Sequence, residues 1–456
     1  MHRLHQFATL AVVAAALALA LWRPDGVAPP VMLAAAVIVL TIGLWALASL
    51  PEQVTSLLFF LLTMLLAVAP PAVVFSGFAS ATVWLVLSGL VIAEAVNRTG
   101  LGRRIAGRLF ARFTGSYARL AFGVWAVATL LAFLMPATVA RILLLVPIVY
   151  AAAERVGLAP ASRGAIGLVL VAILASYQSG TAIIPANAPN LVLAGVAETL
   201  YGIELIYAKY LLLQGPVLAL AKGAVIVALA TRLFGEPVTV PVARPALPPL
   251  SAEERRLAVV LALALAFWAT DFLHGIRSGW VALAAAIACL MPRVGVLPAS
   301  ALNDVRHSAV IYVAATIGMG AVSASSGLSD ALGDWLQRVL PLEPGASAAN
   351  FLWLSGLATA VSMAATNPGL PALMGPLADN LAQAADWPIE AVLMTMAVGF
   401  TTMVLPYQVP PAIVGMQAAG IATRTALRLV LPLAAVSLLV LIPLNGLWWW
   451  LIGFLP

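Results

Sequence analysis

Apolar runs of about twenty residues recur along the chain, and they restrict its fold more than any other feature of the sequence. Such runs occupy residues 30–50, 161–190, 207–234 and 388–420, among others. A helix needs about twenty apolar residues to cross a bilayer. With 63% hydrophobic residues, 9% charged residues and a mean hydropathy of +1.07, the composition excludes a water-soluble domain. We therefore expect an all-α polytopic membrane protein with about eleven transmembrane helices.

Two further apolar blocks, residues 118–153 and 349–385, are each long enough for two passes but are interrupted in the middle. The interruptions read MPATVA at Met135–Ala140 and ATNPGLP at Ala365–Pro371. Irregular backbone at membrane depth must be buried in protein or line a watery cavity. The pattern is therefore typical of two re-entrant helical hairpins with polar tips, and two ordinary spans joined by a very short loop are the alternative.

A different kind of break occurs in TAIIPANAPNLVLAG, Thr181–Gly195, which places prolines and asparagines in an otherwise apolar segment. The stretch LPYQVPPAIVGM, Leu405–Met416, has the same form later in the chain. Unpaired backbone groups are costly in hydrocarbon, so these breaks indicate packing kinks or binding sites. We expect broken helices over residues 161–200 and 388–422.

The chain contains an internal repeat. The stretch VWLVLSGLVIAEAVNRTGL, Val83–Leu101, aligns with VIYVAATIGMGAVSASSGL, Val310–Leu328, at a constant offset of 227. Just beyond, Arg103 aligns with Asp330, and a basic residue opposite an acidic one fits two copies with inverted topology. The expected units are N-terminal transmembrane helices at 1–70, a first repeat at 71–234, a cytoplasmic linker at 235–256 and a second repeat at 257–454.

Arginines mark the expected cytoplasmic face. The segment from residue 98 to residue 119 contains six arginines and no acidic residue, and the linker is also rich in arginine. Cytoplasmic loops carry an excess of such residues. We expect a multi-pass protein of the inner (plasma) membrane with a cytoplasmic N-terminus. The net charge of +6 is then a topology signal and not a sign of nucleic-acid binding.

Inverted repeats with broken helices are typical of secondary transporters, whose substrate lies near the midplane where half-helix ends meet. Half-helix N-termini favour anions, so a small anion is the expected substrate. A membrane enzyme is the alternative class, but the sequence shows no clustered acids, histidines or nucleophiles at one membrane face. We therefore expect no enzymatic activity and no cofactor other than coupling ions.

Two stretches resemble the divalent-anion/sodium symporter (DASS) family. NRTGLGRRIA, Asn97–Ala106, is similar to that family's Thr-Gly-Leu-x-x-Arg-Ile-Ala, and SGTAIIPANAPNLVL, Ser179–Leu193, resembles its Gly-rich stretch ending in Thr-Pro-Pro-Asn. The resemblance covers roughly residues 75–430 and implies transport of dicarboxylates, tricarboxylates or sulfate. It also implies a homodimer in which a mobile part, holding the hairpins and broken helices, moves against a fixed scaffold by an elevator mechanism.

The hairpin tips depart from the family pattern, which places Ser-Asn-Thr ten residues before a proline. The first tip has Ala137, Thr138 and Val139 at these positions, and the second has Thr366, Asn367 and Pro368. Sodium prefers several oxygen ligands, so the first cation site has lost part of its shell. A sodium ion is expected, if at all, near the second tip, with Thr366, Asn367 and Thr402.

Arg141 lies one turn beyond the first tip, where an unpaired charge is costly. We interpret it as a built-in cation that replaces sodium or as a direct anion ligand; the alternative is an arginine that snorkels to the cytoplasm. Lys222 is central in its span, and its functional interpretation is a proton carrier or a counter-charge. Glu94 lies near arginines, so we expect it to form a structural ion pair.

Coupling of transport to sodium, to protons or to neither stays open, and an arsenite- or citrate-type carrier is an alternative. The predicted substrate ligands are Thr138, Arg141, Asn187, Asn190, Thr366, Asn367 and Gln408.

Overall fold

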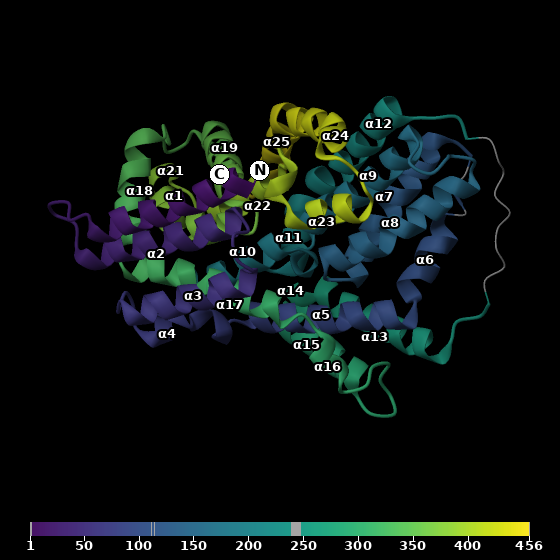
Figure 1. Ribbon diagram of the computed structural model, residues 1–456, viewed down its shortest axis with the longest axis horizontal. Helices are drawn as coiled ribbons and strands as arrows, with labels where there is room; N and C mark the ends of the chain where they lie inside the picture. Colours follow the sequence, from purple (N-terminus) through teal and green to yellow (C-terminus); the bar gives the residue numbers. More distant parts are fainter. Residues whose placement is uncertain (1, 111, 114, 239–247, 456) are drawn as a thin grey trace.

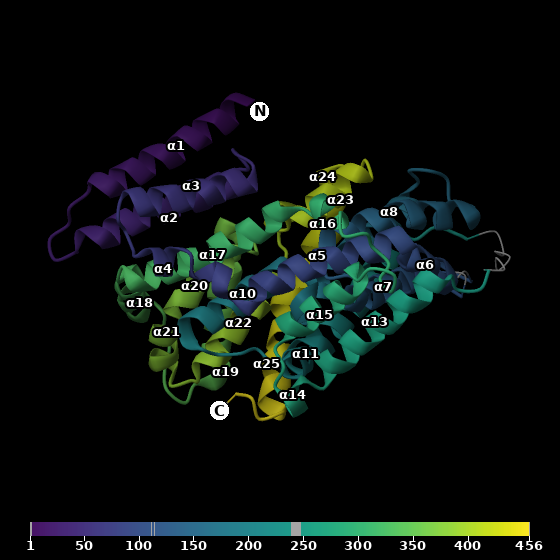
Figure 2. The same cartoon turned by 90° about the horizontal axis from the view of Figure 1, so that it is seen from below.

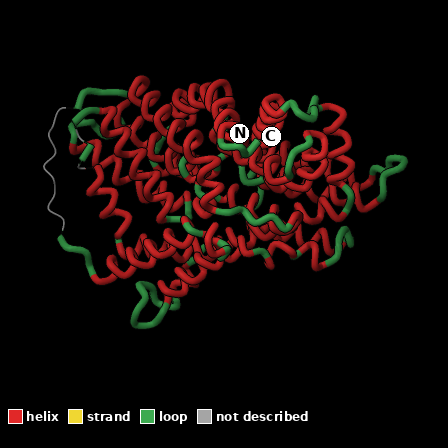
Figure 3. Tube along the Cα trace, turned by 180° about the vertical axis from the view of Figure 1, so that it is seen from behind, coloured by secondary structure: helices red, strands yellow, loops and turns green. Residues whose placement is uncertain are grey.

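The computed structural model describes residues 2–110, 112, 113, 115–238 and 248–455, and the described residues form helices and loops without any strand (Figures 1 and 3). The all-α fold class is confirmed. Eight of the helices are long and apolar enough to cross a membrane, and four shorter apolar helices accompany them. These lengths do not fix the number of crossings, so the expected count of about eleven stays a prediction.

Three N-terminal helices form a layer on one side of the molecule (Figure 2). They are α1 (His2–Leu21), α2 (Pro29–Ala46) and α3 (Glu52–Leu65). The hydroxyls of Thr9 and Ser49 lie 2.7 Å apart and join α1 to the segment between α2 and α3. The short α4 (Pro71–Val74) follows this layer.

The same local structure begins both halves of the chain. Helix α5 (Ala81–Thr99) ends at Gly100, whose φ of 76° is left-handed, and α6 (Leu101–Phe110) follows. Helix α17 (His307–Ser325) is followed by Gly327, with a φ of 80°, and by α18 (Leu328–Val339). Glycine takes this conformation without steric cost, so it ends a helix and redirects the chain. The two glycines lie at the offset of the sequence repeat.

Both interrupted apolar blocks contain a helix break at the residues where the sequence suggested a tip. Helices α7 (Tyr117–Leu134) and α8 (Thr138–Arg155) are separated at residues 135–137. Helix α19 (Ser347–Ala365) ends before Thr366, after which α20 (Leu370–Met374) and α21 (Ala378–Ala385) complete the block.

Both predicted proline breaks also separate helices. Helices α9 (Arg163–Gln178) and α10 (Ala188–Tyr201) flank the first break, and α22 (Ile389–Thr401) and α23 (Pro410–Ala418) flank the second. In Figure 1, α10, α22 and α23 lie between α7 and α8 on one side and α18, α19 and α21 on the other. Three of the four helices that flank the proline breaks are therefore central, with one interrupted block on each side, while α9 packs against α7 and α8.

A π-helical turn interrupts the last long helix of each half. The turns Gly215–Ala221 and Ser437–Leu441 lie between α11 (Tyr207–Gln214) and α12 (Lys222–Phe234) and between α24 (Thr423–Val436) and α25 (Ile442–Leu451). The remaining helices are α13 (Ala252–Ala269), α14 (Asp271–His274), α15 (Ser278–Leu290) and α16 (Ala301–Asp304).

The arginine-rich segment and the end of the linker are in contact. Arg104 of α6 forms an ion pair of 2.6 Å with Glu254, in the first turn of α13, and also donates to the carbonyl of Pro248 at 2.5 Å. Glu254 and Ser251 form a capping box that begins α13. The middle of the linker, residues 239–247 with Arg244, lies outside the described residues.

Candidate functional site

Arg141 is the centre of a first cluster of predicted site residues, in the first turn of α8. Its guanidinium is fully buried. Nη1 donates to the carbonyl of Met135, and Nη2 lies 3.1 Å from Thr138 Oγ1. The same Nη2 lies 2.9 Å from the carbonyl oxygen of Ser176 and 3.0 Å from that of Ala186. One guanidinium therefore joins the first tip to both sides of the break between α9 and α10.

The oxygens around Arg141 are those that a hard cation prefers. Among the described residues no carboxylate pairs with the guanidinium, so its positive charge is balanced only by neutral dipoles. Its Nε has no hydrogen-bond partner in this part of the chain. A snorkelling arginine keeps its charged end in water, whereas this one is enclosed. A Cβ at Gly180 would lie 2.8 Å from Nη2, so glycine there leaves room for the guanidinium.

Thr138 and Asn187 belong to the same cluster. Thr138 Oγ1 lies 3.0 Å from the carbonyl oxygen of Ala186 and 3.3 Å from Asn187 Oδ1. Asn187 Nδ2 is buried and has no hydrogen-bond partner among the described residues. An unpaired buried donor is costly, so this amide is suited to a ligand that supplies an acceptor.

Asn190 has a different environment, although it lies on the next turn. Its Nδ2 donates to the carbonyls of Gly180 at 2.9 Å and Ile183 at 2.8 Å. Its Oδ1 accepts from the hydroxyl of Tyr210 at 3.2 Å. Both amide protons therefore hold the interrupted segment in place, and neither is available to a ligand in this conformation.

Asn367 and Gln408 form a second cluster at the other tip. Asn367 donates through its backbone N–H to the carbonyl of Gln408 at 2.9 Å. The hydroxyl of Ser362 donates to Asn367 Oδ1 at 2.6 Å and accepts from Gln408 Nε2 at 2.8 Å. Gln408 Oε1 also accepts the backbone N–H groups of Val404 and Leu405. The network joins the second tip to the break between α22 and α23 and is satisfied from within the protein.

Thr366, at the second tip, has an unusual backbone. Its φ is 70° and its ψ is 158°, a region that is essentially restricted to glycine. A β-branched residue in this conformation is strained, and such outliers cluster at functional sites. Thr366 is buried beside Asn367, so the strain lies within the predicted ligand set.

Tyr177 connects the two clusters and was missed in the sequence. Its hydroxyl donates to the carbonyl of Phe400 at 2.8 Å and accepts from Asn367 Nδ2. The preceding residue, Ser176, is the one whose carbonyl accepts from Arg141. Both tips therefore meet at the C-terminal end of α9. The only available signal was an isolated tyrosine hydroxyl just before a predicted break.

The residues proposed for sodium have most of their side-chain oxygens engaged. Thr402 Oγ1 donates to the carbonyl of Val398 at 3.3 Å, and Asn367 Oδ1 accepts from Ser362. The described residues contain no cluster of three or more His, Cys, Asp or Glu that would hold a metal. Glu94, expected in an ion pair, has none in the described part of the chain. That expectation was wrong, and Arg104, one of the nearby arginines, pairs with Glu254 instead.

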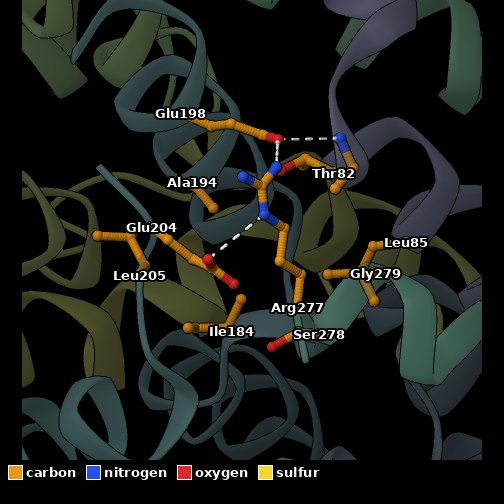
Figure 4. A pocket seen from close by; sticks show the side chains of 11 residues that line it. Thr82, Leu85, Ile184, Ala194, Glu198, Glu204, Leu205, Arg277, Ser278 and Gly279 are labelled. Carbon is orange, nitrogen blue, oxygen red and sulfur yellow. Dashed lines mark hydrogen bonds and ion pairs between the residues drawn. The ribbon is translucent and has the colours of Figure 1, made fainter. Parts of the chain in front are cut away.

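A separate polar cluster joins α10, α15 and the start of α5 (Figure 4). Arg277 lies between Glu198, at 2.6 Å, and Glu204, at 3.3 Å. Glu198 also accepts from the hydroxyl of Ser80 at 2.6 Å. The adjoining cavity has a volume of about 40 Å³, which is room for a few waters at most and too little for a dicarboxylate. No pattern in the sequence pairs these residues.

Comparisons with known proteins match nearly the whole chain. The profile of a family described as "Sodium:sulfate symporter transmembrane region" matches residues 2–455. A protein of Cupriavidus necator described as "Membrane protein" is 26% identical over 483 residues, which cover 99% of this chain and 93% of that protein. The crystal structure of the YdaH transporter of Alcanivorax borkumensis has a TM-score of 0.58 with this chain at 17% identity. That match covers 84% of this chain and 88% of the other, and it shows a shared fold.

Proposed function

The chain belongs to the sodium:sulfate symporter family, and from this membership we propose that it is a secondary active transporter of a small anion. Sulfate and di- or tricarboxylates are the proposed substrates. The observation that carries this proposal is the buried guanidinium of Arg141, which is bonded to neutral oxygens and has no carboxylate partner among the described residues.

Arg141 supplies from the protein the positive charge that a cation gives elsewhere in the family at the first tip. Its acceptors are the carbonyl oxygens at the end of α9 and in the break before α10. Two opposite charges a few ångströms apart interact by about 4 kcal/mol near a protein surface and by more in the interior. A bound anion therefore depends on this charge, whether or not sodium is present.

Neutral donors complete the proposed anion site. Asn187 contributes its unpartnered Nδ2, and the helices that begin at Thr138 and Ala188 contribute N-terminal N–H groups with a partial positive charge. Asn367, Gln408 and Thr366 act from the second tip once their internal network opens. Asn190 contributes by holding the interrupted segment in shape.

The proposed mechanism is an elevator in a homodimer. The interrupted blocks and broken helices move together because Tyr177 and Arg141 tie both tips to α9. The scaffold contains α5 and α15, which contact each other along their length. The N-terminus and the arginine-rich segment face the cytoplasm in this proposal, and the protein lies in the inner membrane.

Uptake by proteoliposomes tests the function. Labelled sulfate, succinate and citrate are offered with sodium or choline outside and with or without a pH gradient. We expect uptake of at least one anion, and because Arg141 replaces the sodium ion at the first tip, the rate in sodium should exceed the rate in choline only slightly. Arg141→Ala is expected to reduce uptake by about a hundredfold or more at every sodium concentration, because the anion loses its charged partner. Arg108→Ala, which removes an exposed arginine of α6, serves as the control and retains uptake.

Two results contradict the proposal. One is a steep sodium dependence that involves several ions in the natural protein, since a permanent guanidinium makes the first sodium unnecessary. The other is normal anion uptake by Arg141→Ala. Uptake that follows the pH gradient instead identifies a proton-coupled carrier, and arsenite transport without carboxylate or sulfate transport identifies an arsenite-type carrier.

A further inference from the structure

Lys222 is a buried cation that the proposed anion site does not use. It is 1% exposed and is the first residue of α12, directly after the π-helical turn Gly215–Ala221. Its Nζ donates to the carbonyl of Thr401 at 2.5 Å. Among the described residues this is its single hydrogen bond, and no carboxylate pairs with it. An ammonium has three N–H donors, so two remain for other acceptors.

Lys222 makes the same kind of contact as Arg141, at the end of the other broken helix. Arg141 binds a carbonyl in the last turn of α9, the first half of one broken helix. Lys222 binds the last carbonyl of α22, the first half of the other. The final carbonyls of a helix have no partner within it and carry a partial negative charge, which attracts a cation. Each broken helix therefore directs its carbonyl end at one buried side-chain cation.

Three oxygens beside the second tip already accept hydrogen bonds from the protein. The carbonyl of Phe400 accepts from Asn367 and Tyr177, and that of Thr401 accepts from Lys222. Asn367 Oδ1 accepts from Ser362. Hard cations need several oxygen ligands at once, and a sodium ion here would also face the ammonium at close range.

Lysine is rare in this protein, which makes its presence at a buried position informative. The chain has 23 basic residues, of which the lysines are Lys209 and Lys222 and the others are arginines. Lys209 pairs with Glu390 at 2.7 Å and is 40% exposed. An ammonium is a compact point charge, in contrast to the planar guanidinium, so it is the side chain that most resembles a bound metal cation.

We propose that Lys222 is the second built-in cation of this transporter and occupies, at the end of α22, the place of a second sodium ion. The inference rests on the proposed function. It predicts that anion transport requires sodium at neither tip, because both positive charges belong to the chain.

Uptake of labelled succinate, sulfate and citrate by proteoliposomes of the full-length protein tests this, with sodium or choline at equal ionic strength. The natural protein is expected to transport equally in both. Lys222→Met keeps most of the aliphatic stem and removes the charge, and we expect uptake to fall by about tenfold or more. Lys222→Ala leaves space for a cation, so sodium or methylammonium is expected to restore part of its uptake. Lys209→Met is the matched control and retains the natural rate.

Melting of the purified protein in detergent gives a second measurement that does not depend on transport. We expect sodium chloride and choline chloride to give the natural protein the same melting temperature, and sodium to stabilise Lys222→Ala by binding in the vacated position. Equal sodium stabilisation of both proteins overturns the inference, and so does uptake by Lys222→Met at the natural rate. If the natural protein transports none of the anions, the proposed function fails, while the melting data still decide whether Lys222 replaces sodium. If the variants do not fold, the sodium dependence of melting in the natural protein decides it.

Discussion

At the scale of single residues, chemically identical side chains have different roles because their partners differ. Asn187 and Asn190 are three positions apart, and the sequence alone suggested that both bind substrate. In the structure Asn190 has both amide protons bonded to backbone carbonyls, whereas Asn187 Nδ2 has no partner in the described part. Residue type and spacing predicted the location of the polar groups but not which of them are already satisfied.

Paired alanine variants test this difference. Asn190→Ala removes two buried hydrogen bonds, from Nδ2 to the carbonyls of Gly180 and Ile183, so we expect it to reduce the free energy of unfolding by about 2 kcal/mol. Asn187→Ala removes an unpaired donor and is expected to leave stability nearly unchanged while anion affinity falls by about 1–3 kcal/mol. Thermal melting and equilibrium binding of the transported anion separate the two effects. Equal losses of stability in both variants would contradict these roles.

Backbone strain at Thr366 predicts a substitution that increases stability. Glycine adopts a φ of 70° with a ψ of 158° at little cost, so Thr366→Gly is expected to raise the free energy of unfolding by about 1 kcal/mol. Thr366→Ala keeps the strain and is the control. The measurement is thermal melting of both variants in detergent, and a lower melting temperature for the glycine variant argues against strain.

At the scale of elements, the sequence located the breaks in the helices well. Proline and polar residues in an apolar run disfavour a continuous helix whatever surrounds them, so these breaks are local properties. The contacts that organise the breaks are not local. Tyr177 binds Asn367 and the carbonyl of Phe400, both far along the chain, and Lys222 reaches Thr401 from another helix. Such pairings depend on the tertiary arrangement and have no signature in either segment alone.

The ion pairs of Arg277 link α15 of the proposed scaffold to Glu198 of the proposed mobile part. An elevator movement separates these elements, so the pairs stabilise one end state only. Partly exposed ion pairs contribute about 0.2–1 kcal/mol, and Arg277→Ala is expected to shift the population toward the other end state by up to about fivefold. Distances between spin labels on α10 and α15 measure this population.

Gln383→Ala is the control for this shift. Gln383 donates to Asp379 at 3.0 Å within α21, inside the second interrupted block, so breaking this contact leaves the populations unchanged. A distance distribution that Arg277→Ala does not alter would show that the two elements do not separate.

The contact between α6 and α13 predicts a pH effect at the membrane surface. The hydrogen bond from Arg104 is the main cause that lowers the pKa of Glu254. A carboxyl whose pKa is lowered by folding stabilises the folded protein fully at pH values above its pKa in the unfolded chain. This contribution is lost as the pH falls through the lowered pKa of the folded protein. Glu254→Gln is therefore expected to reduce the melting temperature at neutral pH and to differ little from the natural protein in strong acid. A difference that persists unchanged in acid would assign the effect to capping alone.

At the scale of the whole molecule, arginine distribution predicts which segments share a side of the membrane. The bond between Arg104 and Glu254 places the arginine-rich segment beside the end of the linker, as the charge pattern suggested. Which side of the protein faces the cytoplasm stays a prediction. Positive charge sets this orientation during insertion, and contacts within the folded protein do not reveal it.

Labelling of introduced cysteines tests that direction. Cys289, the single cysteine of the chain, is buried and is replaced by alanine to give a cysteine-free background. The charge pattern places the acidic loop that contains Glu343, between α18 and α19, on the outer face. We therefore expect an impermeant maleimide to label Glu343→Cys from outside intact cells and to label Arg108→Cys only after the membrane is opened. Labelling in the reverse order would invert the proposed topology.

A sodium ion leaves its carrier together with the substrate, whereas Arg141 and Lys222 stay attached to the chain. In the proposed elevator their charges travel out and back with the protein, so a cycle without a coupled proton displaces only the charge of the anion. At a membrane voltage of about −100 mV, inward movement of each negative charge costs about 2.3 kcal/mol. For such a cycle we expect the voltage to favour efflux of the anion, and the current across a planar bilayer should have the sign of anion flow.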